Sequence, residues 1–537
     1  MSPLVLLALC SAQLALAIPT MDISKRDVLS DLSAGWCRSY KFGVSIANNI
    51  LYMVGLDGGL IPGDENSDHH YLMTLDLTSS FSVNDGSNYK LSVINDTVPD
   101  VKYQAFWPSR DNSTLYMYGG MFLNNVSTDT GIWAYSPNQK IWQILEQEII
   151  IPTRLVNGAN TNAPQIQAAY WVGGYQDSDT TVTITDSTVN YAKGMIQLNT
   201  TTGIYTSLEA PFTPVQDGSL SYIPVGEMGI LVYVGGQVPS IQDGINATMT
   251  PNEWDYVQVY DIAAAKWYNQ TTSGSGVSRT QFCASVQHDE SSSSYEIFFL
   301  GGADFETEDV ITDVSYLSIP SFKWFQASPL DTGRMTMDCA TYGSQIFGVG
   351  GRLAWYVDQR AGCYRMPAFI YDADSEAIRT NFDPTRTTYS VSSSTYDDIK
   401  KSPYPSKWAD SSLEALFVTA NTNNSSTNST STTKDTPLSS NNSTDIGAIV
   451  GGVVGAVAGL IITGALVYFC IFKHRKNKRA AEGVVTERPS TLVDSSPSTT
   501  QALSELWDRK DPSELGGNGR SELASRRATT RFELAEK

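Results

Sequence analysis

The stretch Ile297-Phe298-Phe299-Leu300-Gly301-Gly302 decides the fold, because it joins a short apolar run to a pair of glycines. Runs rich in β-branched and aromatic residues are typical of buried strands. Four other runs of this kind also end in a glycine pair, and a sixth, degenerate copy at residues 50–54 ends in the single Gly55. The five pairs are Gly119-Gly120, Gly173-Gly174, Gly235-Gly236, Gly301-Gly302 and Gly350-Gly351. This recurrence predicts an internal repeat with one buried strand before each pair.

A second pattern follows each glycine pair. It is a strand that ends in an eight-residue turn unit closed by a large residue, and its internal spacing is constant. The clear units run from Tyr135 to Trp142, Leu198 to Tyr205, Tyr260 to Trp267 and Leu317 to Trp324. Residues 371–378 form a weaker copy, and Leu75-Asp76-Leu77 with Phe81 forms one that is a residue short. The repeats differ in length because the loops between their strands differ, while the strands do not.

This β-rich repeat, with a glycine pair after its second strand and an aromatic residue near the end of its fourth, resembles the kelch repeat. In that family one repeat is one blade of a propeller, so the resemblance implies an all-β kelch-type propeller over about residues 36–385. Six blades are predicted, and a seventh could lie in residues 379–419. A glycine pair lets the chain turn where a side chain would crowd the neighbouring blade, and the late aromatic residue fills the wedge between blades. An ordinary β-sandwich with glycine-rich turns is disfavoured, because it would not repeat an aromatic-closed unit.

Two apolar segments predict the cellular location. Residues 4–9 and the small residues Ala15-Leu16-Ala17 predict a secretory signal peptide at 1–17, followed by an N-terminal segment at 18–35. Residues 446–472 carry no charge and form about 40 Å of helix, enough to span a hydrocarbon core of about 30 Å. Lysine and arginine follow directly, so the tail at 473–537, which is predicted to be disordered, lies in the cytoplasm. We therefore expect a single-pass plasma-membrane protein with an extracellular propeller.

Polar segments connect the propeller to the membrane. Residues 386–419 are predicted to close the propeller, and residues 420–445, almost wholly Asn, Ser and Thr, are predicted to be a glycosylated stalk. Sequons for N-glycosylation are present in both the propeller and the stalk. They lie at Asn95, Asn112, Asn125, Asn199, Asn246, Asn269, Asn423, Asn424, Asn428, Asn441 and Asn442.

Four of the six cysteines are expected outside the cell, since Cys10 is in the signal peptide and Cys470 in the membrane helix. An even set in an oxidising compartment predicts up to two disulfides, with three possible pairings. We predict Cys339 with Cys363, because both lie in the sixth repeat. Cys37 with Cys283 then follows by elimination.

The sequence carries little sign of catalytic chemistry. The net charge of −20 and the pI near 4.6 argue against nucleic-acid binding. Adjacent His69 and His70 near several acids have metal-like residue types, but a solvated loop is favoured because no ligand spacing is defined. The acidic loop from Asp304 to Asp309 lacks the pattern of an EF-hand, so an ordinary charged loop is favoured there too. We predict a protein that is not an enzyme and has no cofactor or metal.

The layout of head, stalk, span and Glu-Leu-containing tail resembles kelch-repeat cell-surface proteins of filamentous fungi. That resemblance implies a non-catalytic binding protein whose loops meet a protein or glycan ligand outside the cell. The long inserts at residues 177–191 and 238–256 are the expected contact surface. The alternatives are a membrane-tethered propeller enzyme and a structural wall-contact protein. Homodimerisation is predicted through a ladder of small residues in the membrane helix, Gly447, Gly451, Gly455 and Gly459.

Overall fold

A computed structural model of the chain describes residues 41–57, 70–123, 132–145, 154–211, 215–241, 243–244, 247–355 and 366–424. The chain divides into two compact units, Met1–Ser431 and Thr432–Lys537, and all of the described residues belong to the first. The predicted signal peptide, membrane span and tail lie outside the described residues. Within the ranges given above, no helix has the length and apolar character needed to cross a membrane.

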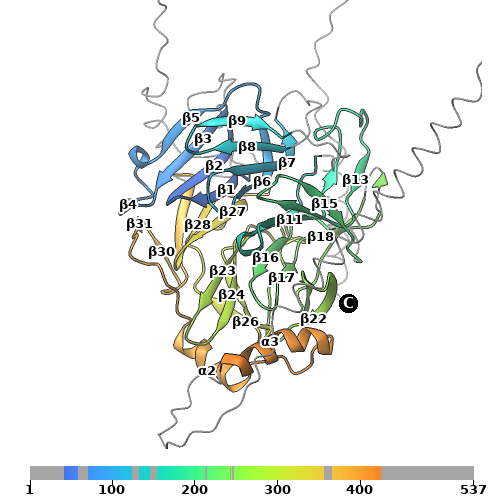
Figure 1. Ribbon diagram of the computed structural model, residues 1–537, viewed down its shortest axis with the longest axis vertical. Helices are drawn as coiled ribbons and strands as arrows, with labels where there is room; N and C mark the ends of the chain where they lie inside the picture. The colour runs from blue at the N-terminus through green and yellow to red at the C-terminus, as the bar shows by residue number, and fades with distance from the viewer. Residues whose placement is uncertain are drawn as a thin grey trace, which may run out of the picture. The chain divides into compact units, whose positions relative to one another are not determined.

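The described residues form six four-stranded antiparallel sheets, each built from consecutive segments of the chain (Figure 1). Blade 1 contains β1 (Gly43–Ala47), β2 (Ile50–Asp57), β3 (His70–Asp76) and β5 (Lys90–Val93), and blade 2 contains β6 (Val101–Pro108), β7 (Leu115–Phe122), β8 (Ile132–Ser136) and β9 (Ile141–Ile144). Blade 3 contains β10 (Ala159–Ala163), β11 (Ala168–Val172), β14 (Met195–Asn199) and β15 (Tyr205–Leu208), and blade 4 contains β16 (Ser219–Ile223), β17 (Ile230–Val234), β21 (Tyr256–Asp261) and β22 (Lys266–Thr271). Blade 5 contains β23 (Cys283–Asp289), β24 (Ser294–Leu300), β25 (Val314–Ile319) and β26 (Lys323–Ala327), and blade 6 contains β27 (Met335–Tyr342), β28 (Gln345–Arg352), β29 (Ala368–Asp372) and β30 (Ala377–Arg379).

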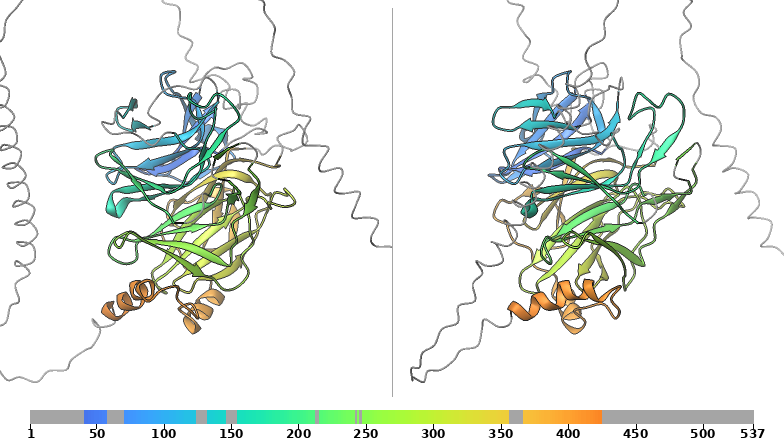
Figure 2. Two further views of the ribbon diagram at one scale, coloured as in Figure 1. Left: turned by 90° about the vertical axis from the view of Figure 1, so that its right-hand side faces the viewer. Right: turned by 45° about the vertical axis from the view of Figure 1, so that its right-hand side comes forward.

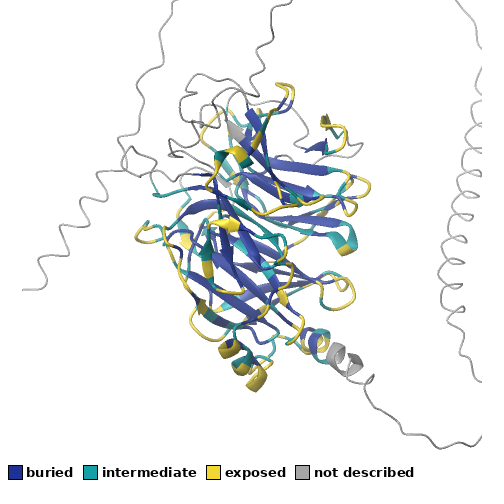
Figure 3. Ribbon diagram, turned by 90° about the vertical axis from the view of Figure 1, so that its left-hand side faces the viewer, coloured by how far each residue is buried: buried dark blue, intermediate teal, exposed yellow. Residues whose placement is uncertain are grey.

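The first strands of the blades contact one another in a closed ring, from β1 through β6, β10, β16, β23 and β27 back to β1. The buried apolar residues fall into six clusters, and each cluster combines side chains of two neighbouring blades. Buried residues follow the strands, whereas exposed residues gather in the hairpins and on the outer sides of the helices (Figure 3). The predicted six-bladed propeller is therefore confirmed.

The eight-residue turn units are hairpins between the third and fourth strands. Their first and last residues are cross-strand partners, as in Tyr135 with Trp142 and Leu317 with Trp324. Trp324 belongs to the cluster between blades 4 and 5, and its indole N–H donates to the Trp254 carbonyl oxygen at 3.1 Å. The closing aromatic residue thus fills a wedge between blades, as the resemblance implied.

The first repeat departs from the expected unit. Phe81 does not lie on the fourth strand of blade 1; it lies on the short β4 (Phe81–Ser82), which pairs with β31 (Asn381–Phe382). The fourth strand is β5, which begins nine residues later and follows a short 3-10 turn, η4 (Gly86–Asn88). The extra pairing joins the chain after blade 6 to blade 1, and the Phe81 and Phe382 rings pack with centroids 5.2 Å apart.

The segment expected to hold a possible seventh blade is helical instead. After β31 the chain forms α2 (Ser393–Lys401) and α3 (Ser411–Asn424), so no further blade is present among the described residues. The Ser392 hydroxyl caps α2 by accepting the Thr395 N–H. Leu413 and Phe417 of α3 are buried against blades 4 and 5. The last residues of α3 belong to the segment that the sequence assigns to the stalk.

The predicted disulfide pairing is wrong. Cys283 on β23 is bonded to Cys339 on β27, with Cα atoms 5.6 Å apart. Neither Cys339–Cys363 nor Cys37–Cys283 can then form, and Cys37 and Cys363 lie outside the described residues. The two bonded cysteines are 56 residues apart in sequence, but their strands are the innermost ones of adjacent blades. Closure of the ring, rather than membership of one repeat, brings them together.

We expect Cys283→Ser and Cys339→Ser each to lower the free energy of unfolding by about 2–4 kcal/mol, because both remove the same cross-link between blades 5 and 6. Denaturant unfolding of the two variants checks this, and the double variant should be no less stable than either single one. Peptide mapping without reductant provides an independent readout. A bond from Cys339 to Cys363 in the map would contradict the assignment.

Candidate functional site

The glycine pairs lie at or near the ends of the second strands at one face of the propeller, beside the start of the next blade. The first glycine of a pair has a positive φ, +67° at Gly173 and +59° at Gly301, and a Cβ at either position would lie 2.2 Å from a carbonyl oxygen of the next blade. The second glycine donates its N–H to that same carbonyl, as Gly302 does to Arg334 at 2.7 Å. The predicted reason for the pairs, close approach of the neighbouring blade, is confirmed.

At this face a ring of six residues surrounds the central channel, one residue from each blade. In each blade, the last apolar residue before the glycines pairs with a residue at the start of the first strand. The ring residue lies two positions before that first-strand residue. All but the first have a positive φ, between 54° and 64°. The ring residues are Lys41, Tyr103, Asn157, Asp217, Gln281 and Thr336.

Backbone hydrogen bonds join neighbours in this ring. The N–H of Asp217 donates to the Asn157 carbonyl oxygen at 2.9 Å, that of Gln281 to Asp217 at 3.0 Å, and that of Thr336 to Gln281 at 2.7 Å. On the other side, Tyr103 donates to Lys41 at 3.0 Å. The left-handed backbone turns each N–H toward the preceding blade, so the side chains are held at fixed positions around the axis.

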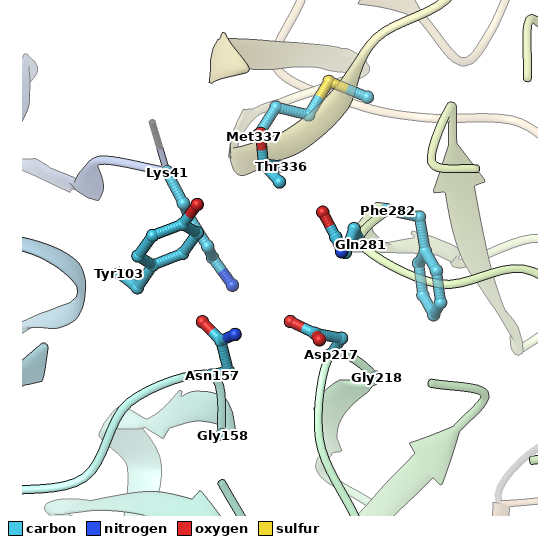
Figure 4. A pocket seen from close by; sticks show the side chains of 10 residues that line it. All are labelled: Lys41, Tyr103, Asn157, Gly158, Asp217, Gly218, Gln281, Phe282, Thr336 and Met337. Carbon is cyan, nitrogen blue, oxygen red and sulfur yellow. The ribbon is translucent and has the colours of Figure 1, made fainter. Parts of the chain in front are cut away.

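Figure 4 shows the Lys41 amine and the Asp217 carboxyl directed into the space between the ring residues. The volume open to the centres of water molecules is ≈ 20 Å³, about what one ordered water needs. Asn157 Oδ1, Gln281 Oε1 and Thr336 Oγ1 are buried here without a hydrogen-bond partner in the protein. At this level the ring side chains leave room for about one water molecule.

Two carboxyl groups near Lys41 have altered proton affinity. Burial raises the pKa of Asp217 to about 7, against the opposing effect of Lys41 and Arg352. Burial also raises the pKa of Asp338, on β27, and Lys41 again opposes the shift. Asp217 lines the channel, and both aspartates are half-buried. Sequence reasoning missed this cluster because its members come from blades 1, 4 and 6.

We expect the free energy of unfolding to fall as the pH rises from about 4 to about 7. In that window native Asp217 retains a proton that the unfolded chain releases, and above pH 7 the effect is complete. Buried Glu296, whose pKa is also raised to about 7, acts in the same direction. Asp217→Asn should therefore raise the melting temperature more at pH 8 than at pH 5, whereas exposed Asp186→Asn should not. Equal shifts at both pH values would contradict the assignment.

The two predicted inserts lie beside the ring on the same face. Tyr175 and Gln237, at the start of the inserts, pair with Val156 and Gln216, which immediately precede ring residues. The first insert forms β12 (Tyr175–Gln176) and β13 (Val189–Tyr191), and the second forms β18 (Gln237–Pro239), β19 (Asp243–Gly244) and β20 (Met249–Pro251). Because β13 pairs with β19, the inserts of blades 3 and 4 join in one small sheet at the edge of the propeller (Figure 2).

Three buried arginines hold the glycine pairs in place. Arg154, Arg279 and Arg334 each donate to the carbonyl oxygen of a first glycine, at 2.6, 3.1 and 3.3 Å respectively. Each lies two or three positions before a ring residue. No constant spacing from the glycine pairs marks them in the sequence, because they lie 19, 22 and 16 residues before Gly173, Gly301 and Gly350.

The remaining predicted sites have mixed outcomes. Asn95, Asn199 and Asn269 are exposed and Asn112 is half-buried, while Asn125, Asn246 and the sequons beyond α3 lie outside the described residues, as do the four membrane-helix glycines. Asn423 and Asn424 lie in the last turn of α3.

His70 is buried on β3, and His288 stacks on Tyr295 with ring centroids 4.3 Å apart. The described parts of the chain contain no group of three or more His, Cys, Asp or Glu side chains that could hold a metal ion. In the acidic loop, the Asp304 carboxylate accepts the backbone N–H groups of Glu306 and Thr307.

Comparison with known proteins bears on the fold. No family model matches the sequence. A kelch repeat-containing protein of Arthroderma benhamiae is 28% identical over 390 residues, which cover 63% of this chain and 56% of that relative, so the match spans little more than half of the relative's length. The solved structure of YjhT is 14% identical with a TM-score of 0.45, and the match covers 65% of this chain and 99% of that one. The repeated glycine pairs, the six four-stranded blades and the kelch repeat-containing relative together support a kelch-type propeller as the fold of this chain.

Proposed function

We propose that this chain is a non-catalytic binding protein of the cell surface, and that the face bearing the inserts binds an extracellular protein. Kelch-type propellers are suited to protein interaction because a rigid wheel carries loops of variable length. The observation that carries the proposal is the β13–β19 pairing, which fuses two inserts into one projecting surface beside the channel. Val182 and Ile241 on these inserts are 42% and 40% exposed, so apolar side chains are available to a partner on this surface.

Helices cover part of the face opposite the inserts. α2 and α3 pack against the hairpins at the other ends of the strands: Phe417 contacts Phe322 of the β25–β26 turn, and Gly226, in the turn between β16 and β17, lies against Leu416. The chain therefore leaves the propeller on the face away from the inserts.

The proposal is tested on intact cells with a peroxidase fused behind the signal peptide, which labels neighbouring surface proteins. The test variant replaces residues 178–188 and 240–248 with short Gly-Ser linkers. The matched control replaces Ser291–Ser293, the tip of a hairpin on the opposite face, with a short Gly-Ser linker in the same way. We expect a set of partners labelled by the native chain and by the control but lost in the insert variant. Identical labelling by all three chains would contradict the proposal.

Two alternatives have distinct outcomes. The first alternative is a structural wall-contact protein that acts as a spacer through its stalk. Such a protein should keep its function when an inert domain replaces the propeller. A membrane-tethered enzyme is the second candidate, and Lys41 and Asp217 in the channel favour it. If the channel were catalytic, Asp217→Asn would abolish function while leaving partner labelling intact.

The proposed membrane helix gives a further test. Gly451→Ile and Gly455→Ile should block close helix approach and reduce self-association of the full-length chain in a crosslinking assay. Unchanged self-association would leave the helix as a plain anchor.

A further inference from the structure

The chain after the last blade crosses the face opposite the inserts as a separate segment, which we call the strap. The strap comprises residues 387–417, which include α2, the loop after it and the first half of α3. In Figure 2 its two helices (orange) lie along the lower end of the propeller. Among the described residues the strap contributes no strand to any sheet. Its attachment to the blades therefore depends on side chains.

Buried side chains of two blades bind the backbone of the strap. Asp289 of blade 5 is buried, and its carboxylate accepts the Val391 N–H at 3.1 Å. Gln270 of blade 4 is completely buried. Its amide group donates to the Lys407 carbonyl oxygen at 3.0 Å and accepts the Ala409 N–H at 2.8 Å. Because a buried polar group without a partner is unfavourable, both blades have side chains placed to hold this segment.

Three apolar side chains fasten the helices of the strap. Ile399 of α2 packs in the cluster between blades 5 and 6, and Leu413 and Phe417 of α3 pack in the cluster between blades 4 and 5. Beside α2 the packing is incomplete, because a pocket of ≈ 170 Å³ lies between part of this helix and two hairpins of blade 5. Open space of this size removes contacts that would otherwise hold the helix. The fastenings therefore lie at separate points along the chain.

The segment just before the strap is held to the blades at the ring closure. Gln345 of blade 6 is completely buried, and its side-chain amide forms two hydrogen bonds with the Asp383 backbone, at 2.8 and 2.9 Å. The Arg386 guanidinium pairs with the buried carboxylate of Asp372 at 2.7 Å. Immediately before these residues, β31 pairs with β4. Residues 381–386 thus form a fixed base for the strap.

A pull on the chain beyond Asn424 acts on these contacts one after another. It loads α3 first, then the loop held by Gln270, and then α2, so few contacts resist at any moment. Neighbouring strands of a blade, such as β23 and β24, are instead paired residue by residue and resist together. The strap should therefore detach at a lower force than a blade unfolds, and detachment should stop at the base, residues 381–386.

We propose that the strap is a tension-release device, which detaches under a pull from its C-terminal side while the six blades stay folded. The roughly 30 released residues, at about 3.3–3.6 Å each, add about 100 Å of extended chain. Release also uncovers Phe322 of blade 5, against which Phe417 packs with ring centroids 5.9 Å apart. The use of the device rests on the proposed function, because tension requires a partner on the inserts and an anchor beyond residue 424. The detachment itself does not.

Optical tweezers applied to the detergent-solubilised full-length chain test the proposal. One handle is attached to a peptide tag inserted after Asp186 in the first insert, and the other to the C-terminus. We expect a reversible first step, with a contour-length gain of about 100 Å, at a lower force than the unfolding of the propeller. Unfolding in a single step, or a first step as long as a whole blade, would overturn the proposal.

A matched pair of substitutions locates the fastening. Gln270→Ala removes two hydrogen bonds to the strap, so it should lower the force of the first step without changing its length or the force at which the propeller unfolds. The control is Gln143→Ala, because Gln143 is an exposed glutamine on β9, the corresponding outer strand of blade 2. Equal effects of the two substitutions would count decisively against a strap held by Gln270.

Hydrogen exchange of the unmodified chain gives a second measurement, which needs neither a tether nor a folded variant. Amide hydrogens of residues 391–417 should exchange through local opening, about tenfold or more faster than those of the strands in blades 4 and 5. Exchange of the strap only by global unfolding, with the denaturant dependence of the strands, would overturn the proposal. Neither measurement involves the surface partners of the inserts, so failure of the strap is distinguishable from failure of the proposed function.

Discussion

Gly301→Ala is expected to prevent stable folding of the propeller. A Cβ at this position would lie 2.2 Å from the carbonyl oxygen of Arg334 in blade 6, and the φ of +59° adds the strain of a left-handed backbone. The contact is with backbone, so no side-chain rotation relieves it. We expect a loss of more than about 4 kcal/mol, in the range seen when buried backbone must move. Denaturant unfolding of the purified chain, or a loss of folded protein on expression, measures the effect.

Gly203→Ala separates the clash from the backbone strain. Gly203 has a similar φ of +71°, but the nearest atom to its would-be Cβ is the end of the Leu145 side chain at 3.2 Å. Its loss should be about 1–2 kcal/mol, the cost of a left-handed residue with a side chain. Equal losses at the two positions would show that close blade approach is not the reason for the glycine pairs.

Arg279→Met should cause the next largest loss, about 3–5 kcal/mol. The Arg279 side chain is completely buried, and its guanidinium donates to the carbonyl oxygens of Gly301 and Asp313 at 3.1 and 2.8 Å. It also pairs with the Asp313 carboxylate at 2.5 Å. Burial lowers the pKa of this arginine, while Asp313 opposes the shift and keeps it charged. Methionine retains the length of the side chain but leaves a charge and two carbonyl oxygens without their partner.

The control is Lys266→Met, which removes the ion pair of Lys266 with Asp410 at 2.8 Å. Both of those side chains are more than a third exposed, so water screens their attraction and we expect a much smaller loss than at Arg279. Thermal or denaturant unfolding of the two variants compares them directly. Adding Asp313→Asn to Arg279→Met should recover part of the stability, because it removes the charge left unpaired. A loss at Arg279 no greater than at Lys266 would contradict the structural role assigned to the buried arginine.

The sequence by itself determined the blade. Apolar runs, glycine pairs and aromatic-closed hairpins are local patterns, and each acts through neighbours along the chain or through the blade that follows it. Their constant spacing therefore predicted the strands, the eight-residue turn units such as Tyr135 to Trp142, the reason for the glycines and the position of the inserts. The one local error, at Phe81, arose where β4 pairs with β31, about 300 residues away in the chain.

Only the tertiary structure decided what ring closure brings together. Cys283 meets Cys339 because innermost strands of adjacent blades touch, and Lys41 meets Asp217 because six blades surround one axis. The pocket beside α2 likewise combines residues of blade 5 with a helix that follows the last blade. Periodicity specifies how each repeat folds but carries no information about which side chains of different repeats converge. That convergence depends on the number of blades and on the path of the chain after the last one.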